Sequence, residues 1–336
     1  MLDISTLEKY DSQQMYKIYD RWAEIARESF ESEQDSVNFD DIKHIVFAGM
    51  GGSGAIGDMF ASILSKSKIH VNIVKGYLLP QTVNSDTLVI VASVSGNTAE
   101  TLSVLESAND LGCKIIAFSS GGKMQEYCKK NEIEHRVIPK YHSPRASFTS
   151  YLYTIFKVLY STFEIKQDDI LESITELEKI GKKINSSNLT NENLALRLAE
   201  YITGIPVIYY PFGLQAAAIR FKNSLQENSK IHAMIENIVE TCHNGIVSWE
   251  RTSNVQPILI QGADDFIKTK ERWEILKKYF EKNNINYFEI SSVKGSILSK
   301  IINLIYILDY SSIYFAVMSK IDPTPVKSIE FVKSKL

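Results

Sequence analysis

The sequence has few of the residues that build disulfide frameworks and metal centres. Among its 336 residues are three cysteines and six histidines, with no CxxC pair and no HExxH or HxH pattern. Cys113, Cys128 and Cys242 are an odd number, and we interpret them as free thiols. Ligands can still converge from distant segments, but the spacing predicts no metal site and no other cofactor.

Long runs of like charge and long apolar runs are also missing. The formal net charge is −3, and no run of five or more Lys or Arg occurs, which argues against a nucleic-acid or anionic-membrane partner. Apolar stretches such as 88–91 and 301–308 are far shorter than the roughly 20 residues that cross a bilayer. The first 30 residues mix acidic with apolar side chains, unlike a signal peptide. We therefore expect a soluble cytoplasmic protein.

Short runs of Val and Ile alternate with amphipathic helical segments from about residue 42 onward. This alternation is typical of a parallel sheet covered by helices on both faces. The expected strands lie in 44–50, 70–77, 86–93, 114–120 and 135–139, and the expected helices end near 64, 111, 130 and 162.

A second round with the same order of elements follows a polar stretch. Its strands lie in 204–211, 255–265 and 285–291, and its helices in 212–225, 269–282 and 301–318. We infer an α/β fold of two tandem doubly wound parallel-sheet domains, flavodoxin-like in type. The expected division is a helical segment 1–40, a first domain 41–165, a linker 166–195 and a second domain 196–336.

Two polar loops follow strands of the first domain, at the edge where doubly wound sheets bind ligands. The first reads Gly49-Met50-Gly51-Gly52-Ser53-Gly54 and formally matches the dinucleotide pattern GxGxxG. A dinucleotide site would want an acidic residue after the next strand, where this chain has Lys75, so we disfavour a nicotinamide-dependent dehydrogenase.

The second loop, residues 93–98, packs three hydroxyls and a glycine into six residues before a helix. Serines here often serve only as helix caps. Two such loops on neighbouring strands instead favour a cradle for a phosphate, because helix N-termini and hydroxyls both stabilise a dianion. The predicted phosphate-binding residues are Gly52, Ser53, Ser93, Ser95 and Thr98.

GMGGSG followed by SVSGNTAETL resembles the phosphosugar-binding loops of sugar isomerase (SIS) domains. Further along, the sequence is similar to the bifunctional phosphoglucose/phosphomannose isomerases at HSPRAS (142–147), KNSLQENSKI (222–231), CHNG (242–245) and DPTPVKSI (322–329). Where that family has an aromatic residue between the loop serines, this chain has Val94. The resemblance spans residues 46 to 330 and implies interconversion of glucose, and of mannose, 6-phosphate with fructose 6-phosphate.

The same resemblance implies the roles of four residues. Glu227 matches the base that moves a proton between C2 and C1 of the sugar, and His243 matches the ring-opening histidine, which in relatives comes from the neighbouring subunit of a homodimer. Arg145 matches the arginine that stabilises the enediolate, and Lys294 matches a lysine near the site. From the residues alone, each would be a surface or turn residue.

Tolerance of both C2 epimers is attributed in relatives to a small threonine near the C terminus. By spacing, that position is Val326 here, with Thr324 two residues earlier. Valine keeps the volume of threonine but cannot form a hydrogen bond.

Two other functions remain open. A non-catalytic phosphosugar sensor would need neither Glu227 nor His243, and no helix-turn-helix or basic stripe is visible. The isomerase half of an aminating enzyme would follow a glutaminase domain, but position 2 is Leu rather than a nucleophilic Cys.

Overall fold

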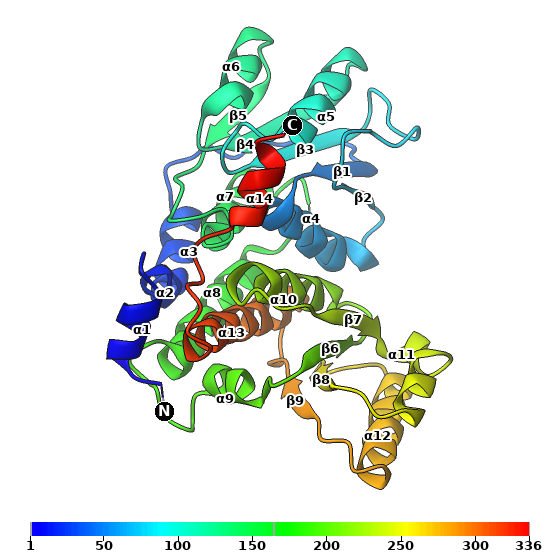
Figure 1. The fold of residues 1–336 in the computed structure, drawn as a ribbon. Helices are drawn as coiled ribbons and strands as arrows, with labels where there is room; N and C mark the ends of the chain where they lie inside the picture. The colour runs from blue at the N-terminus through cyan, green and yellow to red at the C-terminus, as the bar shows by residue number, and fades with distance from the viewer. Residues whose placement is uncertain (1, 164, 336) are drawn as a thin grey trace. The chain divides into compact units, whose positions relative to one another are not determined.

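The computed structural model describes residues 2–163 and 165–335. The chain forms two compact units, each around its own parallel sheet (Figure 1). The five-stranded unit consists of Arg21–Glu178 and Gly295–Ser299, and the four-stranded unit of Met1–Asp20, Lys179–Lys294 and Lys300–Leu336. The expected α/β class with two parallel sheets is confirmed.

In the five-stranded unit, every strand pairing is parallel and the strand order is β2-β1-β3-β4-β5. This is the flavodoxin-like order, in which the direction of winding switches between β1 and β3. The elements are α3 (Trp22–Phe30), β1 (His44–Ala48), α4 (Gly51–Ile63), η1 (Leu64–Lys66), β2 (His70–Val74), β3 (Leu88–Ser93), α5 (Ala99–Asp110), β4 (Lys114–Ser119), α6 (Gly122–Lys130), β5 (Glu134–Val137) and α7 (Phe148–Leu159).

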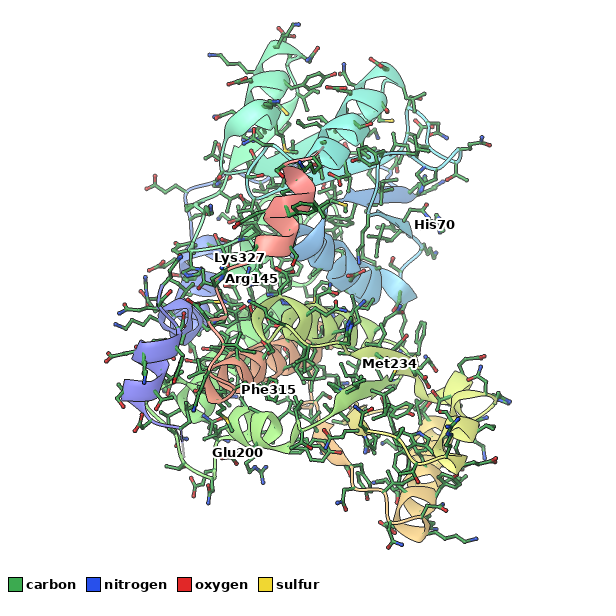
Figure 2. The ribbon with its side chains drawn as sticks, viewed as in Figure 1. His70, Arg145, Glu200, Met234, Phe315 and Lys327 are labelled. Carbon is green, nitrogen blue, oxygen red and sulfur yellow. The ribbon has the colours of Figure 1, made fainter. Side chains whose placement is uncertain are left out.

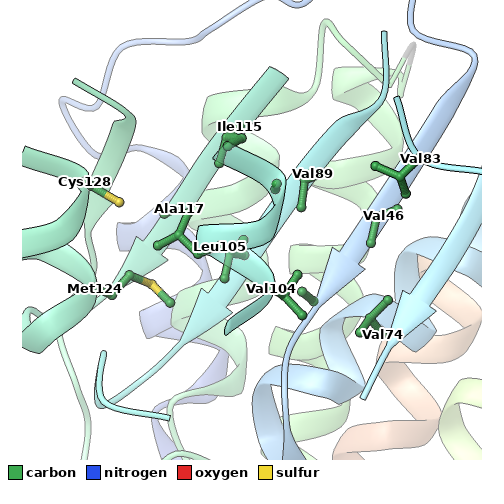
Figure 3. Close-up of a cluster of buried hydrophobic side chains, with 13 residues drawn as sticks. Val46, Val74, Val83, Val89, Val104, Leu105, Ile115, Ala117, Met124 and Cys128 are labelled. Atoms are coloured by element: carbon green, nitrogen blue, oxygen red, sulfur yellow. The ribbon is translucent and has the colours of Figure 1, made fainter. Parts of the chain in front are cut away.

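The central strands β1, β3 and β4 are buried on both faces. Successive residues of each strand point to opposite sides of the sheet, so each side packs against its own set of helices. On one face, strand residues such as Val46, Val89 and Ala117 pack against Val104 and Leu105 of α5, together with Met124 and Cys128 of α6 (Figure 3). On the other face, Phe47 stacks on Phe60 of α4 at 4.6 Å between ring centroids. Cys128 therefore serves as a core residue, as expected for a free buried thiol.

The four-stranded unit repeats the pattern with the strand order β7-β6-β8-β9, again parallel throughout. One face of the sheet packs Tyr209 and Leu259 against Trp273, Leu276 and Phe280 of α12. The elements are α1 (Ile4–Tyr10), α2 (Met15–Asp20), α9 (Leu194–Tyr201), β6 (Ile205–Tyr210), α10 (Gln215–Asn228), β7 (Met234–Asn237), α11 (Ile238–Thr241), η2 (Gly245–Glu250), β8 (Val255–Gln261), α12 (Ile267–Lys282), β9 (Phe288–Ser291) and α14 (Lys327–Lys333).

Two long helices each have residues in both units. Helix α8 (Gln167–Ile184) occupies most of the segment expected to be a linker, and α13 (Ile297–Met318) follows β9. By length and mean hydropathy (1.6), α13 could cross a membrane, whereas the sequence analysis noted only the shorter run 301–308. Its most apolar window is 89% buried, which is how the core helix of a globular protein behaves.

Candidate functional site

The loop after β1 forms the first wall of a polar site at the carboxyl edge of the five-stranded sheet. Helix α4 begins directly after Met50, which has no side chain able to cap it, so the first N–H groups of α4 face the loop. Ser53 lies in that first turn, is 6% exposed and donates its backbone N–H to Met50 O at 3.0 Å. These donors and the helix dipole favour an anion at this point.

The loop after β3 forms the second wall. Thr98 is the N-cap of α5 but makes no side-chain capping bond, and its hydroxyl lies 3.0 Å from Ser93 Oγ. Ser93 is 2% exposed and also accepts the Gly96 N–H at 3.1 Å, so this hydroxyl shapes the loop from inside. Ser95, by contrast, is exposed. Of the three predicted hydroxyls, those of Ser95 and Thr98 are therefore better placed for a ligand.

A third loop, between β4 and α6, braces this cradle and was not predicted from the sequence. Gly96 has a φ of +67°, and a Cβ at this residue would overlap the carbonyl oxygen of Gly121. Asn97 Oδ1 accepts the N–H of Lys123 at 3.0 Å, and Gly96 O accepts that of Met124 at 2.9 Å. The sequence signal was present, because residues 119–122 read Ser-Ser-Gly-Gly after a strand.

Behind the third loop lies His135 of β5. Its Nε2 is 2.8 Å from Ser119 Oγ, which donates to Gly121 O and so connects the imidazole to the cradle. Burial, with a smaller contribution from the positive charge of Arg136, lowers the pKa of His135 below its ordinary value. The neutral imidazole is thus the form that the fold favours.

Arg145 reaches the cradle from the segment before α7. An ideal Cβ on Gly52 would lie 3.0 Å from Pro144 O and 3.3 Å from Arg145 Cα, so the two backbones pack directly on each other. Arg145, which is labelled in Figure 2, is buried, with an exposed fraction of 5%. Trp22 Nε1 donates to the neighbouring carbonyl of Ala146 at 3.0 Å. The Ser147 hydroxyl donates to Tyr141 O and Ser143 O, and these hydrogen bonds stabilise the turn formed by residues 141–147.

Lys75 has a partner that explains why it follows β2. Its Nζ lies 2.6 Å and 2.8 Å from the carboxylate oxygens of Asp58 on α4, and that carboxylate is 7% exposed. Lys75 Cε would be 3.2 Å from a Cβ on Gly54. The lysine thus supports the first loop through α4 and occupies the place where a dinucleotide site needs an acid.

In the four-stranded unit, Glu227 lies half-buried in the last turn of α10. Beyond the helix end, Lys230 is in the left-handed region at φ +58°, and the Ile231 N–H is bonded to Leu225 O at 3.4 Å. Lys230 Nζ donates to Glu227 O at 2.6 Å and to Pro323 O at 3.1 Å. This lysine, which the sequence analysis did not single out, holds the segment 322–326 against the helix end that carries Glu227.

His243 is exposed and follows α11, beyond the carboxyl end of β7. Glu227 precedes β7, so the two residues lie beyond opposite ends of the same strand, which is about 13 Å long. Within one unit they are therefore not brought together. The rule that ligands bind at carboxyl ends of strands holds for the cradle but does not describe the position of Glu227.

The remaining predicted residues lie near the chain's C-terminal elements. Lys294 is exposed beyond the carboxyl end of β9, the edge strand opposite β7, and lies near Asp264, whose pKa is lowered mainly by its hydrogen bond and ion pair with Lys300. Thr324 donates its N–H to Asp322 Oδ1 at 2.9 Å, and Val326 is the N-cap residue of α14. Lys294 is thus separated from Glu227, whereas Thr324 belongs to the segment tied to Lys230.

Among residues 2–163 and 165–335, no group of three or more His, Cys, Asp or Glu side chains has the arrangement that could hold a metal ion.

Comparison with protein families gives two matches that follow the two sheets. Residues 38–162 match the SIS domain, and residues 191–336 match the bacterial phospho-glucose isomerase C-terminal SIS domain. Among solved structures, the fold is similar to the C-terminal domain of glucosamine-fructose-6-phosphate aminotransferase from Francisella tularensis. That likeness has a TM-score of 0.69 and 16% identity and covers 93% of this chain and 97% of the other.

Two curated relatives resemble nearly the whole chain. A protein of Caldicellulosiruptor bescii named bifunctional phosphoglucose/phosphomannose isomerase is 34% identical over 90% of this chain and 91% of its own length. A protein of Aquifex aeolicus with the same name is 32% identical over 91% of this chain and 94% of its own length.

Proposed function

The chain belongs to the family of bifunctional phosphoglucose/phosphomannose isomerases, and we propose that it interconverts glucose 6-phosphate and mannose 6-phosphate with fructose 6-phosphate. The observation that carries this proposal is the cradle at the carboxyl ends of β1 and β3, with the backbone of Arg145 packed against Gly52. Helix N-termini and hydroxyls meet there beside the backbone of a buried arginine, and a sugar phosphate needs groups of these kinds.

The reaction is an internal transfer of two protons and two electrons. Once the sugar ring is open, the Glu227 carboxylate takes the proton from C2 and the C1 carbonyl oxygen gains negative charge, forming a cis-enediolate. The proton returns to C1 while the O2 hydroxyl loses its proton to O1. C2 becomes the carbonyl, so C1 is reduced, C2 is oxidised, and the product is the ketose.

Two further groups complete this chemistry. Arg145 supplies a fixed positive charge for the enediolate oxygens, which is worth most where water is excluded, and its guanidinium belongs to a residue that is 5% exposed. His243 transfers the proton that opens the ring. Phosphate binding is assigned to Ser95, Thr98, Ser53 and the N–H groups beside Gly52, with Ser93 shaping the loop.

We propose that the functional form is a homodimer in which His243 serves the site of the partner chain. Glu227 and His243 lie beyond opposite ends of β7, and His243 is exposed, so a second copy can present this histidine without rearranging its own sheet. A cytoplasmic role in carbohydrate metabolism fits this reaction. Lys294 lies beyond the carboxyl end of β9, whereas Glu227 precedes the amino end of β7, so we assign Lys294 no step of the proton transfer.

The direct test mixes the purified chain with fructose 6-phosphate and follows the formation of both aldose phosphates. We expect both products, and we expect the rate to persist in EDTA. A chain that binds fructose 6-phosphate without converting it would be the non-catalytic sensor. Conversion that appears only with glutamine or ammonia would indicate an aminating enzyme, and loss in EDTA reversed by zinc or manganese would contradict the metal-free reaction.

A further inference from the structure

Helix α10, which carries Glu227, is joined to α13 by a line of buried polar contacts. Arg220, Ser224 and Asn228 are spaced i, i+4, i+8 and so lie along one stripe of α10. Their partners on α13 are Asp309 and Ser312, three residues apart and thus on one face. We call these five residues the polar seam. The two helices run side by side in Figure 1.

The contacts of the polar seam are short and fully enclosed. Arg220 donates from Nε to Asp309 Oδ2 at 2.9 Å and forms an ion pair from Nη2 at 2.6 Å, with side-chain exposures of 3% and 0%. Ser224 Oγ donates to Asp309 Oδ1 at 2.7 Å. Asn228 Nδ2 donates to Ser312 Oγ at 2.8 Å, and the next residue, Ser229, donates to Ser312 O at 2.7 Å.

Stability alone does not account for such a pair. Desolvating two charges costs several kcal/mol per ion, and well-packed apolar residues of the same volume are often equally or more stable. The polar seam fixes the position of α10 on α13, because its hydrogen bonds can all form at only one rotation of α10 about its axis and one shift along that axis. The last turn of a helix commonly frays. In α10 this turn is held because Asn228, its last residue, and Ser229, the residue after it, both donate hydrogen bonds to Ser312 of α13.

Glu227 precedes Asn228 and therefore points about 100° away from it around the helix axis. With side chains about 5–6 Å from that axis, a rotation of α10 by about 10° moves the carboxylate by about 1 Å. A displacement of about 1 Å at a reacting group can cost about 10²-fold in rate. A small loosening of the polar seam should therefore affect the position of the Glu227 carboxylate more than it affects the stability of the fold.

We propose that the polar seam is a positioning device for the catalytic base: Arg220, Ser224, Asn228, Asp309 and Ser312 act through α10 to hold Glu227 at the C1–C2 bond. This inference rests on the proposed function. Because the phosphate is assigned to the five-stranded unit, loosening the seam should lower kcat and leave KM nearly unchanged.

The test replaces the ion pair by apolar residues of similar volume, in the double variant Arg220→Met/Asp309→Leu of the full-length chain. We expect a melting temperature at or above that of the wild type, KM within about threefold, and kcat lower by about 10- to 100-fold. Leu304→Ala, a buried residue of α13 outside the seam, is the control: it should lower the melting temperature and keep kcat. If the double variant is stable and keeps kcat within about threefold, the seam has only a structural role.

Hydrogen exchange of the backbone amides of residues 222–229, measured on the same proteins, tests independently of catalysis whether the polar seam fixes the end of α10. We expect faster exchange there in the stable double variant than in the wild type, because the end of α10 is no longer fixed. Unchanged exchange overturns the inference. A wild type that converts no fructose 6-phosphate refutes the proposed function, and exchange then still decides whether the seam fixes α10.

Discussion

Glu227 belongs to a helix end whose other polar groups are committed to structure: Asn228 and Ser229 bond α13, and Lys230 bonds the carbonyls of residues 227 and 323. The substitution Glu227→Gln replaces the carboxylate of Glu227 by an amide of the same shape, so it should keep the structure of this helix end and remove only the base. We expect kcat to fall by about 10²–10⁴-fold with little change in KM. The matched control is Gln226→Ala, an exposed neighbour, and a Glu227→Gln enzyme with a kcat close to that of the wild type would remove Glu227 from this role.

Val326 bears on the choice between C2 epimers. It is the last residue of the segment 322–326 that Lys230 holds against the end of α10, and it lacks the hydroxyl of the threonine to which epimer tolerance is attributed in relatives. We expect both aldose phosphates to be substrates, with mannose 6-phosphate weakened by about 10-fold, the effect of one neutral hydrogen bond. Comparing kcat/KM for the two epimers in wild type, Val326→Thr and Val326→Gln tests this. An epimer ratio that the Val326→Gln change leaves unaltered would place Val326 outside the pocket.

His135 makes the stability of the five-stranded unit depend on pH. Burial lowers the pKa of this imidazole below its ordinary value of 6.5. As the pH falls through 6.5, the unfolded chain therefore binds a proton that the folded chain refuses, and the free energy of unfolding decreases. We expect His135→Gln to reduce this loss in urea titrations from about pH 8 to about pH 5, relative to the exposed control His232→Gln. Equal pH dependence in the two variants would contradict the assignment.

At the scale of elements, the cradle is built from three loops that do different work. Ser95 and Thr98 are the hydroxyls to which we assign the proposed phosphate, whereas the hydrogen bonds of Ser93 and Asn97 hold the loop in shape. Phosphate is bound about equally in the ground and transition states, so Ser95→Ala/Thr98→Ala should raise KM by at least about tenfold and change kcat little. Ser107→Ala, on the same helix α5, is the control, and a selective loss of kcat would show that the cradle takes part in the chemistry.

The elements that the sequence predicted are those with a strong local pattern. Runs of Val and Ile identified β1, β3, β4, β6 and β8, because strands buried on both faces must be apolar along their length. Strand β7 was missed, since it is an edge strand of four residues that ends in Glu236-Asn237. An edge strand has one neighbour and one exposed side, so its composition differs little from that of a loop.

The site was predictable in part for the same reason. Loops rich in glycine and hydroxyls indicate an anion-binding site. Glu227, His243 and Arg145 were identified only by resemblance, because a single charged residue or histidine at a helix end or in a loop has no local sequence signature. The brace of Gly96 against Gly121 and the polar seam arise from contacts between distant segments. Composition could not reveal that Arg220 is 3% exposed.

At the scale of the whole molecule, the placement of Glu227 and His243 beyond opposite ends of β7 makes a prediction about subunits. Glu227→Gln and His243→Ala should each be nearly inactive alone. In a dimer of one chain of each kind, one of the two sites has both residues intact. Random pairing in an equal mixture makes about half of the dimers mixed, so the mixture should recover about a quarter of wild-type activity. Co-expression with two affinity tags yields the mixed dimer, and a mixed dimer without recovery would place both residues in a site of one chain.

The chain order of the four-stranded unit has a consequence during synthesis on the ribosome. Asp20, at the end of α2, accepts a hydrogen bond from Tyr310, which lies 290 residues later, and Tyr306 donates to Tyr19 O. At about 5–20 residues per second, the first helices wait about 15–60 s for these partners. Over that time Leu7, Met15 and Tyr16, which are buried in the finished fold, remain in water. We therefore expect the nascent N terminus to depend on a chaperone until α13 emerges.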